Sequence, residues 1–396
     1  MIKSKKKILV IFYSIVFFGL FLYSFTQVDL NLTLVPKGFL QEIQKNLTYI
    51  GYFNRPFSTA IFLTIITALS LLYLFSIYLI KKRQLTLKTL SLILGIATII
   101  LVFSYPAFSY DIYNYMFDAK TVLVYGESPY AVKPLDFPGD PWIRFMHWTH
   151  RPSVYPPVWI GLTFVPFLLG LNKFILILLN LKILMALSFL GSAYLVYKIA
   201  RQINVENPIL PVGLFVLNPV MLIENLVSGH NDIVMMFFAI LGIYFLIKRK
   251  NGFALLSVIA SALIKYTSVV LTPLVIYKMT QDRMGKTIDK RRIIQAATIL
   301  MFAGLLGVVT KIEVQPWYLV WILPFFVLWE SKYQIPLIIG TTFGLLLRYA
   351  PYLYFGDWNP PVPEMKFILT TICLLSIIPI VAYLFIKEKY GTSKSS

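Results

Sequence analysis

The chain has 396 residues, of which 58% are apolar and only 13% are charged. Soluble domains have about 45–50% apolar and about 25% charged residues, so this composition excludes an ordinary soluble protein and indicates an integral membrane protein. The formal net charge of +19 would suggest a nucleic-acid partner in a soluble protein. Here, however, more than half of the Lys and Arg residues lie between apolar runs, in the clusters 3–7, 81–88, 248–250, 278–292 and 387–394. This is the positive-inside pattern of membrane proteins, and it requires no nucleic acid.

Long apolar runs predict membrane helices along most of the chain. A bilayer core needs about 20 apolar residues per helix. The first run, 8–26, is longer than the apolar region of a signal peptide and has no small-residue cleavage site after it, so we expect a retained anchor. Further spans are expected at 57–80, 86–105, 174–198, 208–227, 233–247, 298–311, 317–329, 335–347 and 367–386. The sequence therefore predicts an all-α, polytopic integral membrane protein with about 10–13 transmembrane helices, in the cell membrane if the source is prokaryotic.

Two apolar segments do not fit a simple series of crossings. Segment 158–170 is too short to cross comfortably, and segment 253–277 has basic clusters at both ends. Both could be broken or re-entrant helices. Irregular backbone at membrane depth persists only where protein or a water-filled cavity satisfies it, so these segments suggest a polar cavity.

The basic clusters also predict the sidedness of the loops. Used as inner-side markers, they place 27–55 and 106–156 on the outer side and the C-terminus inside. The second loop is far longer than the usual 4–6 residues, and such loops are usually functional. We therefore divide one membrane domain into an N-terminal hairpin with a third span (1–105), an extracytoplasmic catalytic loop with juxtamembrane helices (106–156) and a C-terminal bundle (157–396).

Two carboxylates stand out in the 106–156 segment. Asp111 and Asp118 are seven residues apart and would share one face of a helix, with Tyr115 and other aromatic residues around them. Asp111 follows a predicted span directly, so it could act as a general base near the membrane surface. The alternative is an amphipathic juxtamembrane helix with interfacial tyrosines and solvated aspartates.

Charged residues also interrupt the apolar runs further along the chain. Glu224 is a carboxylate inside a predicted span, which costs about 2.5–3.5 kcal/mol and indicates a functional site; a hairpin turn would explain the following 228–232 but not Glu224. Lys265 lies too deep in 253–277 to reach the interface easily. It is either a hinge residue at a helix break or a cation that binds phosphate.

Two further residues allow two interpretations each. Arg151, next to His150, could contact lipid headgroups or form part of an anion site. Trp317 could belong to an interfacial aromatic belt or stack on a sugar.

The order of these motifs resembles that of multi-pass C-type (GT-C fold) glycosyltransferases, and most closely their polyprenyl-phosphate-mannose-dependent mannosyltransferases. The resemblance covers roughly 109–321. The motifs that carry it are the following: Asp111-Ile112-Tyr113-Asn114-Tyr115, Tyr125-Gly126-Glu127-Ser128-Pro129-Tyr130, Tyr155-Pro156-Pro157, Asn218-Pro219 with Glu224, Gly229-His230-Asn231-Asp232, Lys265-Tyr266 and Pro316-Trp317-Tyr318.

The resemblance implies a donor in which a sugar, expected to be mannose, is linked to a polyprenyl phosphate, and a lipid-linked or glycan acceptor. It places the catalytic carboxylate at Asp111, which would deprotonate the acceptor hydroxyl for a single inverting displacement. Fixed cations must stabilise the leaving phosphate, and Arg151, His230 and Lys265 are available. Supporting or substrate-binding residues are expected at Asp118, Tyr115, Tyr130, Glu224, Asp232 and Trp317, with Asp232 orienting His230 by a hydrogen bond.

Two features qualify this hypothesis. The catalytic loop is usually expected after the first span, whereas 8–26 and 57–80 precede it here, which an added N-terminal hairpin would explain. A lipid-linked sugar flippase or another polytopic transporter is the alternative function, although no internal repeat of the transporter kind is visible. No ligand cluster beyond His230 and Asp232 supports a divalent metal, so we expect no cofactor and no metal.

Overall fold

The computed structural model describes residues 2–30, 32 and 37–391, so Lys394 of the last basic cluster lies outside the described residues. Within these ranges every regular element is helical and none is a strand. The prediction of an all-α chain is confirmed.

In the part of the chain that the structure describes, five helical segments are long and apolar enough to cross a membrane, by length and composition. A sixth candidate is an apolar stretch that bends by 59° at a short break. This agrees with a polytopic membrane protein. The five are α1 (Ile2–Ser24), α3 (Arg55–Lys81), α7 (Phe174–Gln202), α13 (Lys290–Val309) and the succession of α17 (Val362–Leu375) and α18 (Ile377–Gly391); the bent stretch comprises α8 (Ile209–Val216), α9 (Pro219–Leu222) and the π-helical turn η4 (Ile223–Ser228).

The expected count of about 10–13 spans is too high for full-length helices in the described ranges, because several apolar runs form short helices. Even α10, with 16 residues, is only about 24 Å long, less than the roughly 30 Å of a bilayer core. The count made from the sequence included every apolar run, regardless of how much of that run forms a helix. The short apolar helices are α4 (Leu87–Leu101), α6 (Pro157–Leu169), α10 (Asp232–Ile247), α11 (Asn251–Ala262) and η6 (Pro316–Tyr318) with α14 (Leu319–Phe326).

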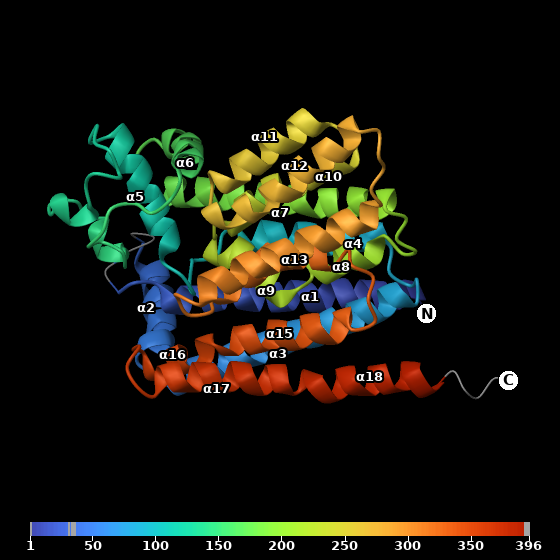
Figure 1. Cartoon of the computed structure of the whole chain (residues 1–396). Helices are drawn as coiled ribbons and strands as arrows, with labels where there is room; N and C mark the ends of the chain where they lie inside the picture. The colour runs from blue at the N-terminus through green and yellow to red at the C-terminus, as the bar shows by residue number, and fades with distance from the viewer. Residues whose placement is uncertain (1, 31, 33–36, 392–396) are drawn as a thin grey trace.

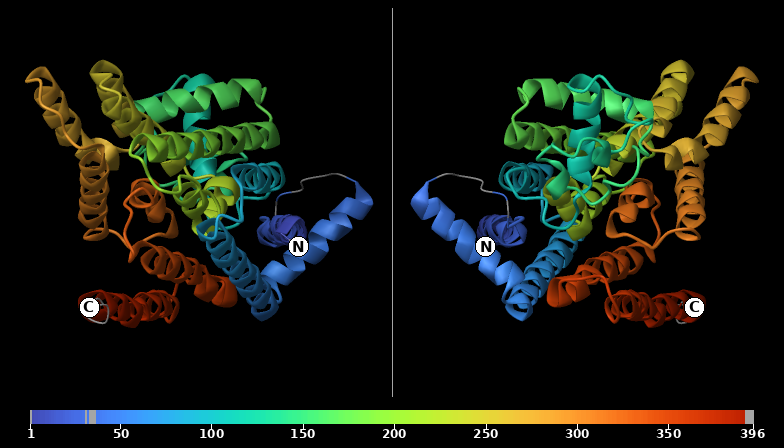
Figure 2. Two further views of the ribbon diagram at one scale, coloured as in Figure 1. Left: turned by 90° about the vertical axis from the view of Figure 1, so that its right-hand side faces the viewer. Right: turned by 90° about the vertical axis from the view of Figure 1, so that its left-hand side faces the viewer.

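The long helices lie roughly along one direction (Figure 1). α1 begins and α18 ends at one end of the bundle, and α5 (Asp111–Leu123) and α2 (Gly38–Tyr52) lie at the other. Figure 2 shows α17 and α18 at the periphery, away from α5. The remaining helices are α12 (Thr272–Arg283), α15 (Gln334–Leu347) and α16 (Tyr349–Phe355), with 3₁₀ turns η1 (Phe25–Gln27), η2 (Pro134–Asp136), η3 (Ile143–Phe145) and η5 (Tyr266–Leu271).

The two irregular segments predicted from the sequence meet each other. α11 ends at Ala262 and η5 begins at Tyr266, so the run 253–277 is broken around Lys265, whose backbone is extended. The carbonyl of Leu263 in this break accepts hydrogen bonds from the N–H groups of Val158 (3.1 Å) and Trp159 (3.2 Å). These N–H groups belong to the first turn of α6, where the regular intrahelical partners are missing, and that of Trp159 also donates to the carbonyl of Pro156 at 3.1 Å. The start of one short helix thus satisfies the broken backbone of another.

A buried ion pair fixes the part of the 106–156 segment that follows α5 to that helix. Lys120 of α5 lies 2.5 Å from the carboxylate of Asp140 and 4.0 Å from the ring centre of Trp142. Tyr125 donates to the same carboxylate at 2.6 Å. Burial favours a raised pKa for Asp140, but the hydrogen bonds from Lys120, Tyr125 and the Trp142 backbone outweigh it and lower that pKa. The loop is therefore held in a defined position against α5.

Candidate active site

Asp111 is the first residue of α5 and faces the bundle. Its backbone N–H donates to the Ser109 hydroxyl at 3.3 Å, and the helix N-terminus favours negative charge at this position. The indole N–H of Trp148 donates to Oδ1 at 3.1 Å, while Oδ2 lies 3.8 Å from Nδ1 of His230. The Asp111 side chain is 21% exposed, so other groups can still reach it.

His230 lies at the centre of the site because of the turn that precedes it. Gly229 has a φ of +74°, and a Cβ there would come within 2.9 Å of Ile112, so this tight turn requires glycine. It places His230 in the core, stacked on Trp317 with ring centres 4.1 Å apart. Nε2 of His230 is 3.4 Å from a carboxylate oxygen of Glu224. Trp317, for which an interfacial belt or sugar stacking was expected, packs on this imidazole and stays partly exposed, so its role toward a sugar stays a prediction.

Glu224 is fully buried in η4. Its Oε1 accepts a hydrogen bond from the Tyr349 hydroxyl at 2.8 Å, whereas Oε2, on the His230 side, has no hydrogen-bond partner among the described residues. A buried carboxylate that is half satisfied in this way needs an explanation. The prediction that Glu224 belongs to a polar site fits this geometry.

Asp232 is the first residue of α10, directly after the His230 turn. One of its oxygens, Oδ1, accepts from Lys265 at 2.7 Å and from the indole N–H of Trp321. The other, Oδ2, lies 3.9 Å from Nδ1 of His230, which is too long for a hydrogen bond. The expected hydrogen bond from His230 to the Asp232 carboxylate is therefore not present, because Lys265 and Trp321 hold that carboxylate through its other oxygen.

Lys265 combines the two alternatives that the sequence left open. It lies in the break between α11 and η5, as a hinge residue would. Its ammonium is also ion-paired with Asp232 and lies 5.4 Å from the centre of the Trp321 ring. At 24% exposure of its side chain, it remains open to an incoming anion.

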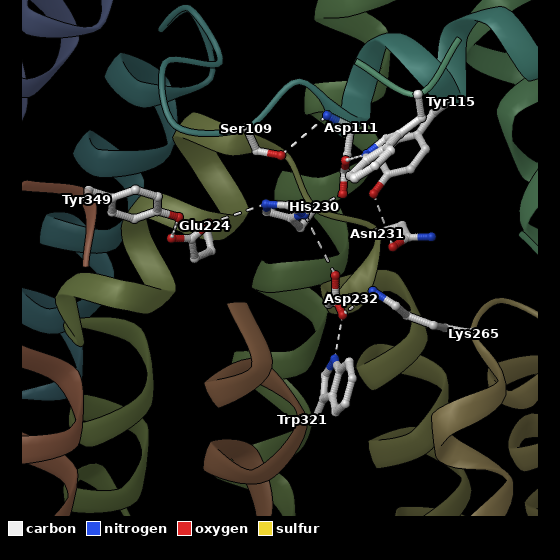
Figure 3. Close-up of polar contacts among 11 residues, drawn as sticks. Ser109, Asp111, Tyr115, Glu224, His230, Asn231, Asp232, Lys265, Trp321 and Tyr349 are labelled. Atoms are coloured by element: carbon white, nitrogen blue, oxygen red, sulfur yellow. Dashed lines mark hydrogen bonds and ion pairs between the residues drawn. The ribbon is translucent and has the colours of Figure 1, made fainter. Parts of the chain in front are cut away.

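Four residues therefore form a row: Asp111, His230, Asp232 and Lys265 (Figure 3). The two inner members are buried, whereas the carboxylate at one end and the ammonium at the other are partly exposed. Both ring nitrogens of His230 lack hydrogen-bond partners among the described residues. Tyr115 connects α5 to the turn by donating to Asn231 at 3.3 Å.

Three predicted site residues make their contacts elsewhere, within the 106–156 segment. Arg151 lies over the Trp148 ring, 4.3 Å from its centre. Asp118 accepts from the Ser153 hydroxyl at 2.7 Å. The Tyr130 hydroxyl donates to a backbone carbonyl in the same segment, that of Tyr155, at 2.9 Å.

Three residues of the site were not predicted. Trp321 lies one helical turn after Trp317, and that spacing could have indicated it. Trp148 lies between two histidines in the polar loop, but aromatic residues are common there. Tyr349 is 125 residues from its partner Glu224, and no local pattern connects them.

No group of three or more His, Cys, Asp or Glu residues within the described ranges has a geometry that could hold a metal ion. Metal independence stays a prediction. Unchanged activity after treatment with a chelator would support it.

Asp118 should make the stability of the protein depend on pH. Burial raises the pKa of Asp118 to about 7, against the lowering effect of the Ser153 hydrogen bond. The folded chain thus keeps a proton that the unfolded chain releases above about pH 4. Because the folded state binds more protons, this group makes the free energy of unfolding fall between about pH 4 and 7, by at most about 1.4 kcal/mol per pH unit.

We predict that Asp118→Asn removes this contribution, since the amide keeps the shape without titrating. Thermal unfolding in lipid nanodiscs, measured from about pH 5 to 8, should fall more steeply for the wild type than for the variant. Parallel curves for the two proteins would contradict the assignment.

Comparison with known proteins places the chain in a family. A family model described as "Alpha-(1->6)-mannopyranosyltransferase, N-terminal domain" matches residues 30–281, more than half of the chain and including the whole row from Asp111 to Lys265. Alpha-(1->6)-mannopyranosyltransferase A of Corynebacterium glutamicum is 28% identical over 182 residues, which is 45% of this chain and 36% of that relative. The match thus spans about a third of the relative's length. No solved structure matches the chain. The chain belongs to the alpha-(1->6)-mannopyranosyltransferase family, which confirms the resemblance found in its sequence.

Proposed function

We propose that the protein is a glycosyltransferase that moves a mannosyl group from a polyprenyl-phosphate donor to a lipid-linked or glycan acceptor on the extracytoplasmic face. The observation that carries the proposal is the row from Asp111 to Lys265. It has a partly exposed carboxylate at one end and a partly exposed ammonium at the other. A transfer reaction from a phosphate donor needs both groups, a base for the acceptor and a cation for the leaving group. Family membership supports the transferred sugar.

Asp111 is the general base in this proposal. The acceptor hydroxyl gives its proton to the carboxylate while its oxygen forms a bond to the anomeric carbon of the sugar. The bond from that carbon to the phosphate oxygen breaks, and its electron pair stays on the phosphate. Attack opposite the leaving group inverts the anomeric centre. Trp148 and the N-terminus of α5 hold the carboxylate in place for this step.

Lys265 and His230 act on the donor phosphate. The phosphate gains a second negative charge as it leaves, so a cation that is already fixed in place stabilises the transition state. Asp232 and Trp321 fix the lysine, and a lysine ammonium has further N–H donors for an anion. His230 presents buried ring nitrogens in the same row.

Transfer by the purified protein in lipid, tested with a panel of polyprenyl-phosphate sugars and with mannoside acceptors, checks the proposal. We expect mannose transfer. Movement of a donor across the bilayer without transfer would favour the flippase instead.

We predict that Asp111→Asn lowers turnover by at least about 10²-fold, because removal of acid–base catalysis costs about this much or more. Donor binding should persist, since the donor phosphate contacts are untouched. The measurement is single-turnover transfer together with donor binding. Glu127→Gln, at an exposed carboxylate of the same loop, is the matched control and should behave like the wild type. Near-normal turnover in Asp111→Asn would exclude Asp111 as the base.

We predict that the reaction with the donor becomes less efficient as the residue at position 265 loses its charge and its polar group, in the order Lys, Arg, Gln, Met. Loss of one member of a charge pair costs about 2–5 kcal/mol, so Lys265→Met should raise the donor KM strongly and leave the acceptor KM nearly unchanged. Steady-state kinetics with each substrate varied in turn measures both. Equal activity of the three variants would make Lys265 a structural hinge only.

The proposed location is also testable. A cysteine placed at Ser128, in a protein whose native cysteine is removed by Cys373→Ala, should react with an impermeant thiol reagent added to intact cells. The exposed loop position makes the site accessible. If this cysteine were protected in intact cells and labelled only after permeabilisation, the segment would lie on the cytoplasmic side, contrary to the proposal.

A further inference from the structure

An exposed aromatic ring lies directly beside the proposed base. Trp148 is 41% exposed, although its indole N–H group is fixed by the hydrogen bond to Asp111. The guanidinium of Arg151 lies over the ring, 4.3 Å from its centre. The guanidinium covers one face of the ring, and the part that stays exposed provides a flat surface for a ligand.

The backbone of Trp148 is hydrogen-bonded to α5, the helix that carries Asp111. The side-chain amide of Asn114, one turn after Asp111 on α5, donates to the Trp148 carbonyl at 3.2 Å. The next carbonyl, that of Thr149, accepts from the backbone N–H of Leu135 at 3.2 Å. Trp148 therefore keeps its position relative to Asp111.

A small polar cavity adjoins the ring. It has a volume of about 20 Å³, and its lining includes Trp148, Arg151, Asn114 and Asp118. Asn114 is 93% buried, and its side-chain carbonyl oxygen has no hydrogen-bond partner among the described residues. This volume holds about one water-sized group, so a hydroxyl fits but a sugar ring does not. An amide oxygen, a carboxyl group and a guanidinium together can both accept from and donate to such a hydroxyl.

We propose that these four residues form the acceptor-sugar subsite. The acceptor ring stacks on the exposed indole of Trp148, and one of its hydroxyl groups enters the cavity between Asn114, Asp118 and Arg151. The hydroxyl that reacts is then presented to Asp111, which shares a hydrogen bond with the same indole. This assignment rests on the proposed function, and it moves Arg151 from the donor phosphate to the acceptor side.

The platform role of Trp148 can be separated from a role in merely positioning Asp111. Trp148→Phe keeps an aromatic face and loses the N–H donor, whereas Trp148→Leu loses both. As a platform, Trp148 should give a nearly unchanged acceptor KM in the Phe variant and about a tenfold higher one in the Leu variant, the scale of a lost aromatic contact. The donor KM should not change in either. Asn114→Ala should also raise the acceptor KM, and thermal unfolding checks that each variant is folded.

The experiment uses the full-length protein in nanodiscs with a soluble methyl α-1,6-mannobioside as acceptor. Binding of this probe, measured by calorimetry without donor, tests the subsite independently of transfer. If the wild type binds the mannobioside and Trp148→Leu does not, the subsite stands even where no transfer occurs and the proposed function fails. If the Phe and Leu variants lose turnover equally while acceptor KM and binding stay at wild-type values, Trp148 only positions Asp111 and the subsite is overturned.

Discussion

The ion pair between Lys265 and Asp232 is the interaction on which the site depends. It connects the break after α11 with the start of α10, and Trp321 from α14 donates to the same carboxylate oxygen. A buried carboxylate without such partners would be strongly unfavourable, so the break in 253–277 and the turn at Gly229 have to form together. The broken backbone at Leu263 is satisfied in turn by the first N–H groups of α6. The Lys265–Asp232 ion pair thus determines how the short helices α6, α10, α11 and α14 meet.

The 106–156 segment adds the second half of the site. Tyr115 connects α5 to the turn that carries His230, and the buried Lys120–Asp140 pair holds the rest of the loop against α5. Asp111 is consequently held next to His230. The loop also supplies Trp148 and Arg151, which face solvent rather than the bundle. Asp111 contacts Trp148 through Oδ1 and approaches His230 through Oδ2, so the groups proposed for the acceptor and those proposed for the phosphate lie next to different oxygens of one carboxylate.

The differences between expectation and structure have common physical causes. Apolar runs were counted as spans although Pro, Gly and polar residues divide several of them into helices of 8 to 16 residues. Asp232 was expected to orient His230, but a lysine 33 positions away competes for that carboxylate. A chain position alone does not show which of two nearby groups receives a hydrogen bond. That outcome depends on distances between helices.

The sequence by itself determined the helical membrane character of the chain, because apolar composition and basic clusters act locally along it. It also indicated Asp111, Glu224, His230 and Lys265 as unusual, since a charged or polar residue in or beside an apolar run is costly wherever the helices pack. The tertiary structure alone decided that these residues meet, that Tyr349 and Trp321 complete their contacts, and that Arg151 lies on Trp148. Those contacts join residues up to 125 positions apart, and only the packing of helices brings such groups within hydrogen-bonding distance.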